Sequence, residues 1–134
     1  MAILSLAALS CSYEFRIDAS FREGRLLFTA GRGGWFAADP CVESLEIIAR
    51  DAAPGARTLY RPVWRIEQAG GVEPVCAPLP IVFGQVPAGL RQSIAPEALR
   101  PGADYEIIAG SHKGDGFGSF RISAANPNAV ETPN

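Results

Sequence analysis

Residues 13–19 alternate between apolar and polar side chains, and this period of two is the feature that most limits what the chain can fold into. Successive side chains of a β-strand point to opposite faces of a sheet, whereas an α-helix repeats its apolar positions every three or four residues. Glycine or proline separates the further strand-like runs, which are residues 25–30, 58–68, 80–86, 105–109 and 116–123. This punctuation is typical of strands joined by turns. The sequence therefore predicts an all-β domain.

Residues 39–53 fit two interpretations. Asp39 could cap a helix with Pro40 at its first position, and a helix over residues 40–52 would make the fold α+β. In a strand, Leu45, Ile47 and Ala49 would instead share one face. We favour the strand, because a Pro-Gly turn follows it and residues 58–68 can complete a hairpin.

The segment at residues 98–105 reads Ala-Leu-Arg-Pro-Gly-Ala-Asp-Tyr. It resembles the tyrosine corner of immunoglobulin-like and fibronectin-III-like sandwiches. The resemblance implies that Leu99 packs into the core and that the Tyr105 hydroxyl bonds to the backbone between Leu99 and Asp104. The fold it implies is an antiparallel, immunoglobulin-like β-sandwich of about seven strands over residues 11–123. Residues 124–134 lack apolar alternation and are predicted to be a disordered tail.

The first ten residues carry no charged side chain. Such a segment is too short to span a membrane, but it fits the apolar core of a secretory signal. It ends in Ala8-Leu9-Ser10-Cys11, which resembles the lipobox of bacterial lipoproteins. The resemblance implies a signal segment at residues 1–10, a lipid on Cys11 and a place in the cell envelope, facing the periplasm. The alternatives are ordinary cleavage after Ser10, or a buried element of a cytoplasmic domain.

The chain has three cysteines. If Cys11 carries a lipid, Cys41 and Cys76 remain as one possible disulfide, which an oxidising periplasm permits. Two buried, unreactive thiols are the alternative.

Charge and spacing exclude several partners. The 12 Lys and Arg and 14 Asp and Glu give a net charge of -2 with no run of either sign, so a nucleic-acid partner is not expected. The glycine-rich segments at residues 31–34 and 114–118 lack the lysine or the helix of a phosphate-binding loop. One histidine and two thiols lack zinc-site spacing, and no calcium loop is present. We expect no metal and no cofactor.

His112 is the only histidine, and Asp104, Asp115 and Ser119 lie near it in the sequence. A nucleophile and its base must lie within hydrogen-bond reach on a rigid frame, which the tip of a hairpin seldom provides. A small hydrolase at His112 is therefore a minor alternative, and the protein is not expected to be an enzyme.

Aromatic residues mark a possible binding patch. Trp35 and Phe36 follow a glycine segment, and Phe117 lies out of phase with the inward-facing Phe120 and Ile122. Trp35, Phe36 and Phe117 could form an exposed apolar surface. The predicted function is a non-catalytic envelope lipoprotein with a binding or structural role. The alternative is an accessory subunit of a secretion or envelope complex, docked through this patch or through residues 80–86.

Overall fold

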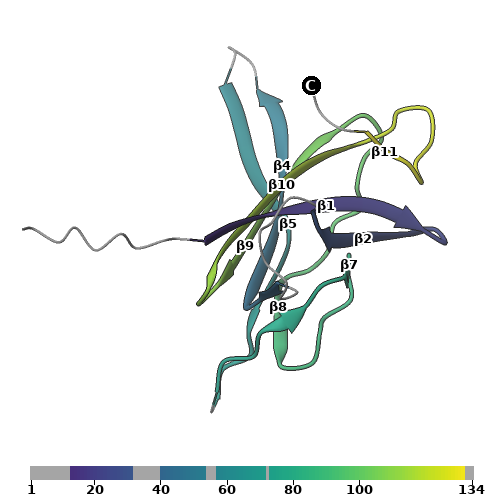
Figure 1. The fold of residues 1–134 in the computed structure, drawn as a ribbon. Coiled ribbons are helices and arrows are strands. Elements are labelled where there is room, and N and C mark those ends of the chain that lie inside the picture. Colours follow the sequence, from purple (N-terminus) through teal and green to yellow (C-terminus); the bar gives the residue numbers. More distant parts are fainter. Residues whose placement is uncertain (1–12, 32–39, 54–56, 72, 132–134) are drawn as a thin grey trace, which may run out of the picture.

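The computed structural model describes residues 13–31, 40–53, 57–71 and 73–131. Their regular elements are β-strands, as the alternation predicts (Figure 1). Within this part of the chain, no helix could cross a bilayer. The strands are β1 Tyr13–Arg22, β2 Arg25–Ala30, β3 Cys41–Val42, β4 Ser44–Ala53, β5 Arg57–Gln68, β6 Ala77–Pro78, β7 Ile81–Val82, β8 Leu90–Ile94, β9 Asp104–Ser111, β10 Gly114–Ile122 and β11 Val130–Glu131.

Nine of the strands form a single mixed sheet in the order β7-β2-β1-β10-β9-β4-β5-β8, with β11 paired to β10. Strands β1 and β10 run parallel, and the other neighbouring pairs are antiparallel. Strands β3 and β6 form a separate two-stranded sheet. The large sheet curls into a half-barrel (Figure 1).

The prediction of a two-sheet, immunoglobulin-like sandwich of about seven strands is therefore wrong. The reason lies in β1, which pairs with β10 along residues 13–16 and with β2 along residues 17–22. One continuous strand thus carries the hydrogen bonding from one half of the molecule to the other. Alternation shows that a strand has one buried face, but it does not show which strands lie beside it.

The helix alternative for residues 40–52 is also wrong. This segment forms β3 and β4, and Leu45, Ile47 and Ala49 are buried at alternate positions. The strand interpretation is confirmed.

Residues 124–131 of the predicted disordered tail are among those that the structure describes, and they fold back onto the sheet, whereas residues 132–134 lie outside the described residues. Strand β11 pairs with the end of β10. The Ser123 hydroxyl accepts hydrogen bonds from the backbone N–H groups of Ala125 and Asn126, and the Ser123 N–H donates to the carbonyl of Ala129. These local bonds turn the chain back onto the sheet without needing an apolar pattern.

The core fills the concave side of the half-barrel. Trp64, Phe28 and Phe120 are fully buried there, and the Trp64 indole N–H donates to the side-chain carbonyl of Gln92. Strands β7 and β8 are the two edges of the sheet, and residues 83–89 link them. Phe83, in this link, packs edge-on against Trp64 with ring centroids 5.2 Å apart. The link therefore helps to cover the open side of the half-barrel.

The predicted tyrosine corner is confirmed as a local motif. Tyr105 is 2% exposed, and the Arg100 backbone N–H donates to its hydroxyl at 2.8 Å. Leu99 packs against the edge of the core. The motif thus ties the loop before β9 to the core, although the fold around it is not a sandwich.

We expect Tyr105→Phe to lower the free energy of unfolding by about 1 to 2 kcal/mol, because the ring still packs while the Arg100 N–H loses its acceptor. Urea unfolding measures this difference. Tyr60→Phe is the control and should leave the midpoint unchanged, since Tyr60 is an exposed residue of β5. Equal midpoints for Tyr105→Phe and the unmodified chain would contradict the prediction.

Candidate functional site

The outer face of the sheet, on the side away from the core, carries exposed apolar side chains. Along β9, Tyr105, Ile107 and Ala109 point to the core, so Glu106 and Ile108 point outward. Phe117 of β10 lies directly opposite Ile108, and the two side chains are 45% and 42% exposed. They form a cross-strand apolar pair that faces solvent.

A groove of about 530 Å³ opens beside this pair. It forms where β1 leaves β10 after Arg16, and its lining includes Ile17 and Ile107, two residues that are each 1% exposed. Gly118 also lines it, and a Cβ at this position would lie 2.1 Å from the carbonyl oxygen of Ile17. The close approach of β1 therefore requires glycine here. Position 118 is in phase with the buried Phe120 and Ile122, so a side chain there would point to the core side of the sheet and not into the groove. We call this feature the outer-face groove.

Ion pairs surround the outer-face groove. Arg16 contacts Asp18 at 2.9 Å, and Arg50 contacts Glu106 at 3.5 Å. Further ion pairs on the same face join Arg65 to Glu46 and Arg121 to Asp104. The hydrogen bond from Arg121 lowers the pKa of Asp104 from its usual value. These arginines each have a carboxylate partner, so the apolar surface lies within a locally neutral rim.

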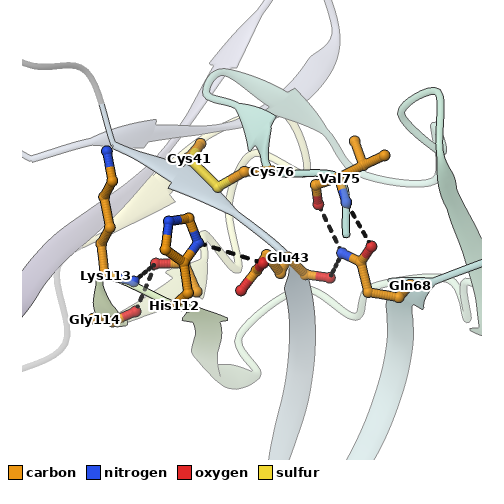
Figure 2. The surroundings of a disulfide bond; sticks show 9 residues. Cys41, Glu43, Gln68, Val75, Cys76, His112, Lys113 and Gly114 are labelled. Carbon is orange, nitrogen blue, oxygen red and sulfur yellow. Dashed lines mark hydrogen bonds and ion pairs between the residues drawn. A yellow bond between two sulfur atoms is a disulfide. The ribbon is translucent and has the colours of Figure 1, made fainter. Parts of the chain in front are cut away.

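The disulfide lies at another place, near the start of β4 (Figure 2). Cys41 and Cys76 are bonded with their Cα atoms 5.2 Å apart, which agrees with the predicted pairing. Beside it, the Gln68 side-chain amide donates to the carbonyls of Glu43 and Val75, and the Val75 N–H donates back to the Gln68 side-chain oxygen. No sequence pattern marks Gln68, because its role depends on hydrogen bonds to Glu43 and Val75, which are not its neighbours in the chain.

The structure does not assemble a catalytic set at His112. Its Nδ1 lies 3.4 Å from a carboxylate oxygen of Glu43, a residue the sequence did not suggest as its partner (Figure 2). Asp104 is held by Arg121 at the opposite end of β9, roughly 26 Å along the strand from His112. Ser119 lies on the outer face beside the groove, and Asp115 lines a separate hollow with His112.

No group of three or more His, Cys, Asp or Glu is placed to hold a metal ion within the described ranges.

The predicted binding patch is placed only in part. Phe117 lies on the outer face, whereas Trp35 and Phe36 lie outside the described residues, as does the predicted lipidation residue Cys11. Sequence reasoning missed Ile108, because Ile107 and Ile108 are both apolar and alternation does not tell which of them faces outward. Only the register of β9 against β10 identifies Ile108 as the partner of Phe117.

No family model matches the chain, and no curated protein or solved structure matches it either. The function must therefore be inferred from the residues and their geometry.

Proposed function

We propose that this protein is a non-catalytic binding protein of the bacterial cell envelope, attached to the membrane through a lipid on Cys11 and facing the periplasm. The observation that carries the binding role is the exposed pair of Phe117 and Ile108 beside the outer-face groove. Exposed apolar side chains that lie side by side within a polar rim are typical of an interaction site.

The disulfide supports a location outside the cytoplasm. Disulfides persist in oxidising compartments such as the periplasm and are rare in the cytosol. With Cys41 and Cys76 bonded to each other, Cys11 is the remaining cysteine of the chain. It stands at the end of the lipobox-like segment and is available for modification.

The topology also suggests how a lipid-anchored domain of this kind would be oriented relative to the membrane. Strand β1 begins two residues after Cys11, and its first residue pairs with Gly114 at the turn between β9 and β10. That turn would therefore face the bilayer. The far end of the β4–β5 hairpin lies at the opposite end of the domain, because the start of β4 pairs with the end of β9 (Figure 1). The outer-face groove would then lie on the side of the domain, open to the periplasm.

Replacing Cys11 with serine tests the anchor. We expect the unmodified chain in the membrane fraction with an intact mass that shows a diacylglyceryl group on Cys11, since lipid chains carry the membrane affinity. Cys11→Ser should move the protein to the soluble periplasmic fraction. Ser12→Ala is the control and should stay in the membrane. An unprocessed N-terminus, or a Cys11→Ser variant still in the membrane, would rule the proposal out.

A further inference from the structure

A second hollow, apart from the outer-face groove, lies at the end of the half-barrel beside the turn between β1 and β2. Its volume is about 340 Å³, which is at the lower end of the range for small-molecule sites. We call it the turn hollow. Its lining is mostly apolar, with few polar residues, which is typical of such sites. The apolar lining residues are Phe21, Leu26, Val82, Phe83, Leu99 and Pro127, and Gly24, Arg25 and Gln85 complete the lining.

Two arginines stand side by side at the mouth of the turn hollow. Arg22 and Arg25 lie directly opposite each other and close the two-residue turn between β1 and β2. Glu23 and Gly24 form this turn with φ angles of 51° and 76°, as in a tight type I′ turn. The turn therefore holds the Cα atoms of the two arginines about 5.5 Å apart. Arg25 alternates with the buried Leu26, so its charge lies at the mouth of the hollow and not among the apolar residues of the floor.

Neither Arg22 nor Arg25 has a carboxylate partner among the residues that the structure describes. Glu23 lies between them in the chain but forms no ion pair with either. The other arginines with described side chains each contact a carboxylate, and these are Arg16, Arg50, Arg61, Arg65, Arg91, Arg100 and Arg121. Like charges directly opposite each other destabilise a pair of strands. An anion from outside the chain would relieve this repulsion.

We propose that the turn hollow binds an amphipathic phosphate, with its alkyl chain on Phe21 and Leu26 and its phosphate between Arg22 and Arg25. The apolar floor takes the chain, and guanidinium groups bind phosphate oxygens through paired N–H donors. A doubly charged phosphate monoester matches two guanidinium groups, whereas a neutral apolar ligand would leave their repulsion in place. The site is distinct from the outer-face groove, so this inference goes beyond the binding role proposed above.

The position of the turn hollow selects the source of the phosphate. Strand β1 has ten residues, or a length of about 33 Å, and Arg22 is its last residue. Cys11 lies just before the other end of β1, so in the anchored orientation proposed above the hollow is far from the bilayer. The ligand is therefore a soluble amphiphile and not a lipid of the anchoring membrane. This choice of source rests on the proposed anchor, whereas the hollow and the two arginines do not.

Calorimetric titration with octyl phosphate tests the site. The full chain carries Cys11→Ser, so that no lipid of its own competes for the hollow, and the disulfide stays intact. We expect a dissociation constant between about 10 μM and about 1 mM. Butyl phosphate should bind at least about tenfold more weakly, because fewer methylene groups are buried. Octanol should also bind at least about tenfold more weakly, because it has no charge for the arginines.

Arg22→Gln and Arg25→Gln should each weaken the binding of octyl phosphate by about tenfold or more. Each variant should unfold at the midpoint of the unmodified chain or slightly above it, since it removes a like-charge pair, so lost binding does not report lost folding. Arg16→Gln is the matched control, because Arg16 lies on the same strand and the same face about 20 Å away. Arg16 also lines the outer-face groove, and its replacement should leave the affinity unchanged.

Several results would overturn this site: no binding of octyl phosphate, equal binding of octanol, or full affinity in both Arg22→Gln and Arg25→Gln. An equal loss in Arg16→Gln would place the ligand in the outer-face groove instead and would also overturn it. Vesicles of phosphatidylglycerol should not bind the Cys11→Ser chain. Vesicle binding that Arg22→Gln abolishes would overturn the soluble source. None of these results affects the lipid anchor, which the membrane partition of Cys11→Ser tests separately.

Discussion

We expect the double variant Cys41→Ser, Cys76→Ser to unfold with a free energy about 4 kcal/mol lower than that of the unmodified protein. The bond spans 35 residues of sequence, and in the chain-entropy model a crosslink of this span removes about that much conformational freedom from the unfolded chain. The crosslinked loop contains β4 and β5, the longest hairpin of the sheet. Denaturant unfolding with and without a reductant measures the loss.

The control for the double variant is the unmodified protein after its disulfide has been reduced. Reduction should destabilise the unmodified chain by about as much as the double substitution, and it should leave the double variant unchanged. The hydrogen bonds of Gln68 to Glu43 and Val75 stay available in both cases, so a remaining difference would report on the serine side chains. Equal unfolding midpoints for the oxidised protein and the double variant would contradict the prediction.

We expect Gly118→Ala to lower the free energy of unfolding by about 3 kcal/mol. This is the second of the two largest effects that we predict. The added Cβ would lie 2.1 Å from the Ile17 carbonyl oxygen and 3.1 Å from the Ile107 side chain. The first of these is a backbone atom of β1, so a side-chain rotation does not relieve the clash. Strand β1 must move away from β10, where it makes the parallel ladder that joins the two halves of the sheet.

Gly110→Ala is the matched control on the neighbouring strand. Its Cβ would lie 3.1 Å from the Ser44 hydroxyl, which can rotate away. The loss in the free energy of unfolding should therefore stay below about 1 kcal/mol. Denaturant unfolding of both variants gives the comparison. A Gly118→Ala protein as stable as Gly110→Ala would show that β1 does not approach β10 as closely as described.

The sequence alone predicted features that depend on short stretches of chain. Alternation over residues 13–19 identified β1, and residues 98–105, which lead into β9, identified the tyrosine corner and the bond to Tyr105. Counting cysteines identified the partners Cys41 and Cys76. The strand and corner predictions succeed because strand alternation and turn chemistry act between neighbours in the chain. The disulfide prediction set Cys11 aside as the expected lipidation residue, which left Cys41 and Cys76 as the pair.

The tertiary structure alone decided how the strands are arranged and which outward side chains meet. A period of two describes the faces of a strand equally well in a sandwich and in one curled sheet, so the division of β1 between β2 and β10 could not be read from it. The same holds for the outer face, where Phe117 meets Ile108 only through the register of β9 and β10. Register depends on contacts between residues far apart in the chain, and these form only when the whole sheet closes around its core.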